Sequence, residues 1–287
     1  GADVAHLTIA FAGSSYRFSG LVPEQLASVR SRFDPLVRSD ETSPDVEVDI
    51  HYTPSPEGFM RRPVGPSESR VAVAPSEDRI AVAGLGFTAN IDRAPLRAQL
   101  HTCLADAWFA GAFENLFRIV ATYRIFEEGG LVMHSAALVD QARGFLFCGR
   151  SGAGKSTLCG LARELEIEVL SDELNAVLPS PSGYSLSAMP FAGDFGGLPI
   201  PRPPYPLTGV LGLEHATGPS IRDCSKAEAV SRIVASCPYV NADPRLIDSL
   251  VQRARELSSL VPLRILSFAK TTSFWGVLNH EYRHGHG

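Results

Sequence analysis

The sequence predicts an α/β protein with two domains, and three observations lead to this prediction. A short apolar segment, Gly144–Cys148, runs into a Gly-rich loop and then into a helical pattern of apolar residues. Residues from about 5 to 92 contain several short segments in which apolar and polar residues alternate, as in half-buried strands. The length of 287 residues, of which 45% are hydrophobic, is enough for two cores. We therefore expect an N-terminal α/β domain over residues 1–128 and a second domain over residues 129–287.

The N-terminal domain is predicted to be rich in strands and to end in a long helical segment. Apolar spacing and turn residues predict strands at Leu7–Phe11, Tyr16–Phe18, Val46–Tyr52, Arg70–Val73 and Arg79–Ala83, the last two forming a hairpin. Proline at a first helical position predicts a helix from Pro23. A helical pattern then runs from Pro95 to Glu128, and Gly129-Gly130 is expected to end it.

The second domain alternates strands and helices. Strands are expected at Leu131–Ala137, Phe145–Cys148, Glu168–Leu170, Thr208–Glu214 and Pro262–Phe268, with a helix from Thr157 to Leu165. The capping box that begins at Ser225 predicts a helix to about Ala235, and Asp243-Pro244 predicts another to about Ser258. His280, His284 and His286 are metal-type ligands, but they are terminal and interleaved with glycine, so we expect a disordered tail.

Composition excludes several classes of partner. The formal net charge of −5 and the lack of a basic block argue against nucleic acid and anionic membranes. No apolar run reaches the roughly 18 residues of a membrane span. Five scattered cysteines without a C-x-x-C pair are typical of reduced thiols, which predicts a cytoplasmic protein.

The segment from Gly149 to Thr157 fits the phosphate-binding pattern G-x-x-x-x-G-K-[ST] at every fixed position. Backbone N–H groups in such a loop and the positive end of the following helix form an anion site. Lys155 is expected to reach the β- and γ-phosphates, and the Ser156 hydroxyl to ligate Mg²⁺. The predicted nucleotide-binding residues are Gly149, Ser151, Gly152, Ala153, Gly154, Lys155, Ser156 and Thr157.

Three further residues lie in register with this loop. His134 precedes Gly149 by fifteen residues, on the strand that enters the second domain. Asp172 follows Lys155 by seventeen residues, at the end of a strand, with Glu173 beside it. A carboxylate at that position can hold Mg²⁺ or accept a hydroxyl proton. His134 as a core histidine, and Asp172 as a helix cap, remain the structural alternatives.

The run from Leu131 to Glu173 resembles the HPr kinase/phosphorylase superfamily, through His134–Val139, Gly149–Thr157 and Leu170–Glu173. The kinase core of that superfamily is similar to phosphoenolpyruvate carboxykinase. The closer likeness is to divergent HPr-kinase-related proteins found beside peptide-maturation genes, some of which phosphorylate peptide serines. The resemblance implies a P-loop kinase core of this type, with a smaller N-terminal α/β domain. An oligomer is compatible with the resemblance, but no residue pattern here supports one.

The resemblance also implies residue roles. Asp172 would deprotonate the attacking serine, Glu173 would help to organise Mg²⁺, and His134 would lie by the reacting phosphate. Catalytic roles therefore fall to Asp172, His134 and Lys155, and metal-binding roles to Ser156, Asp172 and Glu173, with ATP and Mg²⁺ as the ligands. The chain departs from the family in having Asp172-Glu173 where the family has Asp-Asp, and in lacking an R-G-x-G signature, which argues against HPr as the substrate.

The sequence thus predicts a kinase that phosphorylates a serine of a peptide or protein. A kinase of a small metabolite and a non-catalytic nucleotide-binding regulator are the alternatives. Arg202, in a Pro-rich loop, is a further candidate for stabilising transferred charge, although an arginine in such a loop is more often solvated.

Overall fold

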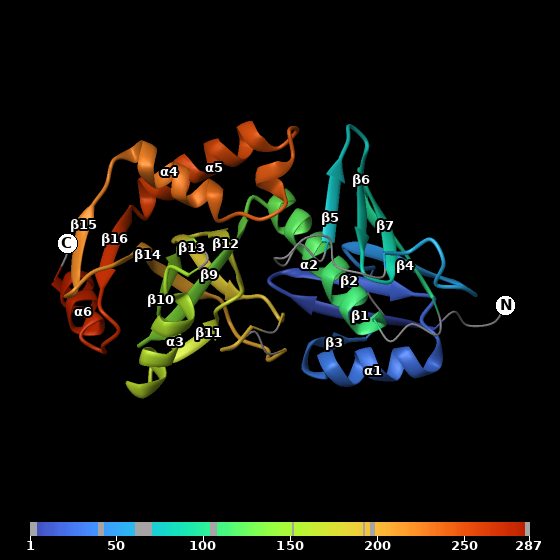
Figure 1. Ribbon diagram of the computed structural model, residues 1–287, viewed down its shortest axis with the longest axis horizontal. Coiled ribbons are helices and arrows are strands. Elements are labelled where there is room, and N and C mark those ends of the chain that lie inside the picture. Colours follow the sequence, from blue (N-terminus) through green and yellow to red (C-terminus); the bar gives the residue numbers. More distant parts are fainter. Residues whose placement is uncertain are drawn as a thin grey trace. The chain divides into compact units, whose positions relative to one another are not determined.

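A computed structural model describes residues 5–39, 43–60, 71–103, 108–150, 152–191, 193–195 and 199–284 (Figure 1). The described chain is a mixed α/β protein with two large sheets, so the predicted α/β class is confirmed. It divides into two compact units, one of Gly1–Arg124 with Pro199–Pro201 and one of Ile125–Leu198 with Arg202–Gly287.

The first unit is built on one eight-stranded sheet with the strand order β3-β1-β2-β4-β8-β7-β6-β5. Its strands are β1 (His6–Phe11), β2 (Ser14–Ser19), β3 (Val37–Arg38), β4 (Val46–Thr53), β5 (Val71–Pro75), β6 (Arg79–Gly84), β7 (Phe87–Arg93) and β8 (Leu96–Cys103). Its helices are α1 (Pro23–Phe33), the 3₁₀ turn η1 (Asp34–Leu36) and most of α2 (Phe109–Glu127). The strands expected near residues 7, 16 and 46, the helix from Pro23 and the hairpin β5–β6 are confirmed.

The core of this unit lies on one face of the sheet, where Figure 1 shows α2 running along β1 and β2. Alternate residues of β2, β4 and β7 are buried, as the strand period of two requires. Phe113 and Phe117 of α2 pack on Phe18, with ring centroids 4.5 and 4.8 Å away. Burial of such aromatic rings stabilises the unit through both area and ring geometry.

The predicted helix from Pro95 is wrong in its first part, because Leu96–Cys103 forms strand β8. β8 pairs in parallel with β4 and in antiparallel with β7, and it buries Leu96, Ala98 and Leu100. Leucines four residues apart fit both a helical face and one face of a strand, and the pairing of β8 with two strands decides between them. Leu104 lies outside the described residues.

The end of α2 at Gly129-Gly130 is confirmed. Gly129 has a φ of 84°, which glycine tolerates without strain. The N–H of Gly129 donates to the carbonyl of Phe126, and the N–H of Gly130 donates to that of Ile125. These bonds satisfy carbonyls that the helix end leaves unpaired. The predicted division of the chain after residue 128 falls at this helix end.

The second unit contains the other large sheet, with the order β10-β9-β12-β13-β14-β16-β15 and further pairings of β11 with β9 and of β10 with β14. Its strands are β9 (Leu131–Asp140), β10 (Arg143–Cys148), β11 (Glu168–Ser171), β12 (Leu174–Ser180), β13 (Gly183–Ala188), β14 (Tyr205–His215), β15 (Ser220–Asp223) and β16 (Leu263–Phe268). Its other elements are α3 (Lys155–Glu164), α4 (Lys226–Ala235), η2 (Val240–Ala242), α5 (Ile247–Leu260) and α6 (Phe274–His284).

In the C-terminal third, the expected strands are confirmed as β14 and β16 and so is the helix after the capping box, whereas two other expectations are wrong. Ser225 caps α4 by accepting the N–H of Glu228, as the capping box predicts. Asp243 accepts the N–H of Arg245 in a turn instead of capping a helix, and α5 begins only at Ile247. The tail expected to be disordered forms α6 through His284, because Phe274 and Leu278 are buried in the core of the unit. His286 lies outside the described residues.

Within the described part of the chain, none of the helices has the length and apolar character needed to cross a membrane.

Candidate functional site

The site lies at one edge of the second sheet, and the strand directions bring its parts together. β10 and β11 both run antiparallel to β9, so their carboxyl ends share one edge of the sheet. β14 runs parallel to β10 and ends at that edge too. Cys148 lies opposite Ser135, which places the loop after β10 beside the segment of β9 that holds His134. Carboxyl ends of neighbouring strands are the usual ligand-binding edge of such sheets.

The phosphate-binding loop follows β10 and leads directly into α3. Gly154 caps α3 with a φ of 104°, a conformation that favours glycine. A Cβ at Gly154 would lie 2.9 Å from Cζ of Phe268, and a Cβ at Gly149 would lie 2.7 Å from Cβ of Ala153. Close packing therefore requires glycine at both fixed positions, and at Gly154 the backbone conformation requires it as well. Strand, loop and helix are arranged as the motif requires, and Ser151 lies outside the described residues.

Lys155 is held inside the loop. Its side chain is largely buried, and the residue is 8% exposed. Its Nζ donates to the carbonyls of Gly149, at 2.8 Å, and Arg150, at 3.4 Å. Burial lowers the pKa of Lys155, and the negative charges of Glu173 and Asp172 partly oppose that shift. A buried ammonium whose acceptors among the described residues are carbonyls is ready to pair with an anion such as a phosphate.

Ser156 and Thr157 lie on the first turn of α3, and Ser156 faces the end of β11. Oγ of Ser156 lies 3.4 Å from Oδ2 of Asp172. Asp172 is 7% exposed, and its Oδ1 accepts the backbone N–H of Phe195 at 3.1 Å. A Cβ at Gly193 would lie only 2.1 Å from that oxygen, so glycine is needed there. Asp172 is thus a fixed carboxylate beside the loop.

His134 and Glu173 form a more open pair next to Asp172. Nε2 of His134 lies 3.8 Å from Oε2 of Glu173, and their side chains are 46% and 31% exposed. The backbone of His134 donates to the carbonyl of Ser236, and Ser135 donates to that of Glu173. His134 is therefore an exposed side chain on a fixed backbone and not a core histidine.

A hydroxyl and carboxylates are the hard oxygen ligands that Mg²⁺ prefers, usually completed by substrate phosphates and water. Ser156 and Asp172 already approach each other, so these residues fit a Mg²⁺ site, with Glu173 adjacent in the chain. The described residues contain no group of three or more His, Cys, Asp or Glu side chains arranged to hold a metal ion.

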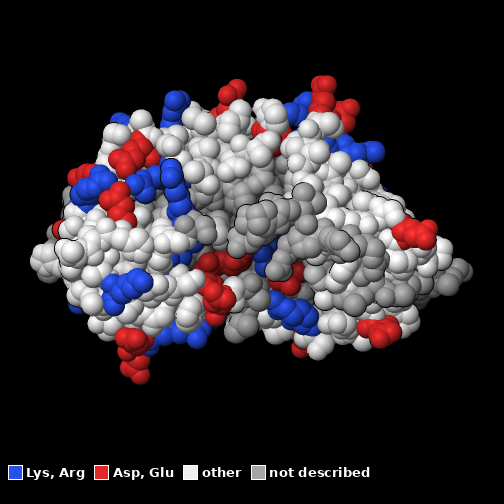
Figure 2. Space-filling view, viewed as in Figure 1, with Lys and Arg blue, Asp and Glu red and all other residues white. Residues whose placement is uncertain are grey.

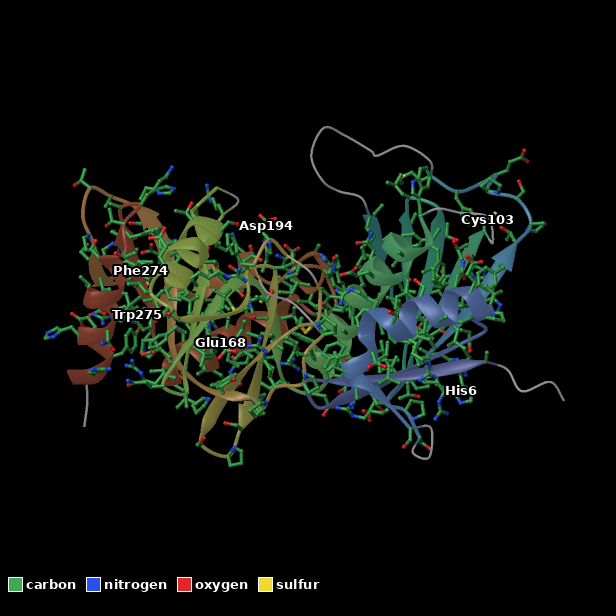
Figure 3. The ribbon with its side chains drawn as sticks, turned by 90° about the horizontal axis from the view of Figure 1, so that it is seen from below. His6, Cys103, Glu168, Asp194, Phe274 and Trp275 are labelled. Carbon is green, nitrogen blue, oxygen red and sulfur yellow. The ribbon has the colours of Figure 1, made fainter. Side chains whose placement is uncertain are left out.

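Arg202 is engaged elsewhere. Its guanidinium pairs with the carboxylate of Glu168, which Figure 3 labels, at the start of β11. Asp172 follows the other end of the same strand. The structure therefore does not bring Arg202 to the phosphate loop.

Sequence reasoning missed His215, the last residue of β14. Its Nε2 lies 3.1 Å from the carbonyl oxygen of Gly152 in the phosphate loop, and its ring packs on Phe268. Because a carbonyl can only accept, Nε2 carries the hydrogen. No motif marks His215, and only its place at the end of a strand parallel to β10 could have pointed to it.

Comparison of the chain with protein-family models and with curated proteins found no significant match. The geometry of the site must therefore carry the functional argument by itself.

Proposed function

We propose that this protein is a kinase that uses ATP and Mg²⁺ and transfers the γ-phosphate to a serine hydroxyl of a peptide or protein. One observation carries the proposal: the strand directions place the phosphate loop, Asp172, Glu173 and His134 at a single sheet edge, with Ser156 and Asp172 3.4 Å apart. A P-loop core of the HPr-kinase type is the arrangement that this proposal assumes.

The loop binds the triphosphate through its backbone N–H groups and the start of α3. Lys155 neutralises phosphate charge, exchanging its carbonyl acceptors for phosphate oxygens. Mg²⁺ held by Ser156, Asp172 and Glu173 would supply further neutralisation of the phosphate oxygens. Positioning and charge stabilisation of this kind account for most of the catalysis in phosphoryl transfer.

In the transfer step the serine oxygen bonds to the γ-phosphorus, the bond from that phosphorus to the bridging oxygen breaks, and ADP leaves. The serine proton passes to a carboxylate. We assign it to Asp172, because the base must reach a hydroxyl beside the phosphate held by Lys155 and Ser156. His134 beside Glu173 stabilises the transferred charge.

The proposed partners are a nucleotide and a peptide or protein acceptor, and the proposed compartment is the cytoplasm. Support for the compartment comes from the thiols: Cys103, Cys148, Cys159 and Cys237 are buried, unpaired and used as small core residues.

The test incubates the full chain with γ-labelled ATP, Mg²⁺ and a library of serine-containing peptides, and compares it with the variant Asp172→Asn. We expect labelled peptide from the wild type and at least a hundredfold less from the variant, with ATP affinity measured on both. Transfer by Asp172→Asn at the wild-type rate would remove the base assignment. Tight ATP binding by the wild type without labelled product would favour the non-catalytic regulator instead.

A further inference from the structure

A cavity of about 490 Å³ lies beside the phosphate loop, and its described lining does not include Asp172 or Glu173. Its walls are the first half of the loop, the end of β14 and one face of α4. The α4 residues concerned are Glu228, Ser231, Arg232 and Ala235, which follow the i, i+3, i+4, i+7 spacing of a single helix face. Its volume falls within the range of roughly 300–1,000 Å³ that small-molecule sites occupy.

The cavity borders the proposed reaction centre at Ser236, a lining residue whose carbonyl accepts the N–H of His134, but Asp172 and Glu173 are not among its described lining residues. Asp172 and His134 lie on the β9 and β11 side of β10, whereas the cavity lies on the β14 side. Lys155, Ser156 and Glu173 are not among its described lining residues. The acceptor must approach the γ-phosphate beside Asp172, so the part of a nucleotide left for this cavity is the nucleoside.

The chemistry of the walls suits a nucleoside. Ala153, Leu213 and Ala235 contribute an apolar floor on which a base can pack. The His215 ring adds a flat surface, fixed by its bond to Gly152 and its packing on Phe268.

Two carboxylates held by two arginines form part of the polar rim, beside Arg150, Ser231 and Ser236, in the part of Figure 2 where acidic and basic side chains gather over β15 and α4. Oε1 of Glu214 accepts from Arg232, at 2.9 Å, and from Arg222, at 3.1 Å. Oε1 of Glu228 accepts from Arg232 at 3.1 Å. Among the described residues these pairings use Oε1 alone, so Oε2 of each carboxylate remains to accept a hydroxyl hydrogen. Carboxylates read ribose hydroxyls in this way in other nucleotide sites.

We propose that this cavity binds the nucleoside half of the nucleotide, with the base on the apolar floor and the ribose hydroxyls on Glu214 and Glu228. The protein therefore selects a ribonucleoside triphosphate over its 2′-deoxy form and over bare triphosphate. This inference rests on the proposed function, because the phosphate loop must hold the triphosphate.

The test measures the affinity of the full chain for ATP, dATP and inorganic tripolyphosphate, each with Mg²⁺, by isothermal titration calorimetry. Ala235→Trp fills the cavity from an exposed position on α4. Ala227→Trp is its matched control, because Ala227 is an exposed alanine of the same helix that lines a different groove. Glu214→Gln weakens one hydroxyl acceptor and keeps the shape of the side chain.

We expect Ala235→Trp to weaken ATP at least tenfold and to leave tripolyphosphate within twofold, while Ala227→Trp changes neither. We expect Glu214→Gln to reduce the preference for ATP over dATP. Equal weakening of ATP and tripolyphosphate by Ala235→Trp, or no weakening of ATP, would overturn the inference. So would a loss of transfer by Ala235→Trp at unchanged ATP affinity, which would assign the cavity to the acceptor.

The wild-type protein separates this inference from the proposed function. If ATP and tripolyphosphate bind equally well, the nucleoside site is wrong and the phosphate loop stands. If neither binds, both proposals fail. If ATP binds more tightly but no acceptor is phosphorylated, the nucleoside site stands and the kinase proposal fails.

Discussion

Oγ of Ser156 lies 3.4 Å from Oδ2 of Asp172, although the two residues follow different strands of the sheet. Ser156 lies on the first turn of α3, after β10, and Asp172 follows β11. β9 runs between these strands and pairs with both. A hydroxyl at a helix start beside a buried carboxylate is an arrangement that suits a metal-bound phosphate, and the proposed function rests on this contact.

Gly193→Ala should disable Asp172 without touching the phosphate loop. The new Cβ would lie 2.1 Å from Oδ1 of Asp172 and 3.1 Å from Cβ of Glu173, so the carboxylate must move. We expect at least a tenfold loss of phosphoryl transfer, and a loss of about 1–3 kcal/mol in the free energy of unfolding from overpacking. Gly218→Ala is the control, because its Cβ would meet nothing within 4 Å. Equal activity of the two variants would contradict the assignment of Asp172.

Lys155→Met should separate stability from binding. The substitution removes a charge-assisted hydrogen bond to phosphate, and such a bond stabilises a complex by about 1.5–3 kcal/mol. We therefore expect ATP to bind roughly ten- to a hundredfold more weakly. The free protein should become more stable at pH 7, since burial lowers the pKa of Lys155 and the buried charge is costly. The free-energy cost of the buried charge is fully present below the lowered pKa and declines as the pH rises towards 10.5. The stability gained by Lys155→Met should therefore shrink over the same pH range.

Lys270→Met is the matched control for that experiment, because Lys270 is exposed. It should change neither ATP affinity in calorimetry nor the free energy of unfolding in urea. A Lys155→Met variant that is less stable than the wild type at pH 7 would show that the lysine has another stabilising role.

His134 and Glu173 should act as a unit. His134→Gln and Glu173→Gln each remove one member of a pair whose side chains are 46% and 31% exposed, so stability should change by less than about 0.5 kcal/mol. We expect each substitution to slow phosphoryl transfer by roughly tenfold or more. The fold loss in rate of the double variant should be smaller than the product of the two single fold losses. Strict multiplication of the rate losses would mean that the two side chains act independently.

The buried thiols predict a loss of stability at alkaline pH. Burial raises the pKa of Cys159 from 9.0 to about 12, and the negative charge of Asp172 adds to the shift. Below pH 9 both folded and unfolded chains keep this proton. Above it only the unfolded chain ionises, so the folded state loses up to about 1.4 kcal/mol per pH unit from this thiol. Urea unfolding at pH 8 and pH 10.5 should show a smaller pH-dependent loss in Cys159→Ala, and an unchanged loss would exclude Cys159 as a source.

Local sequence predicted the elements whose signals are local. The loop motif, the capping box at Ser225 and the glycine pair after α2 each satisfy backbone groups within a few residues, so their structures follow from neighbours in the chain. The spacing of His134 and Asp172 from the loop also predicted that they lie near it: His134 lies within β9, which pairs with β10, and Asp172 follows β11, which pairs with β9.

Contacts between residues far apart in the sequence determine the elements that the sequence did not predict. The pattern of β8 fits a helix as well as a strand, and only pairing with β4 and β7 selects the strand. α6 is stabilised by burial of Phe274 and Leu278, which terminal position and composition do not reveal; Figure 3 labels Phe274 and Trp275 at its start. The cavity proposed for the nucleoside is lined by both α4 and the end of β14, an arrangement that no motif encodes.

The most direct test of the account is calorimetric titration of the full chain with ATP, with and without Mg²⁺, beside the variant Ser156→Ala. The proposed function predicts that the wild type binds ATP and that Mg²⁺ strengthens this binding at least tenfold, an effect that Ser156→Ala largely removes. ATP binding that is absent, or that is indifferent both to Mg²⁺ and to Ser156, would contradict it.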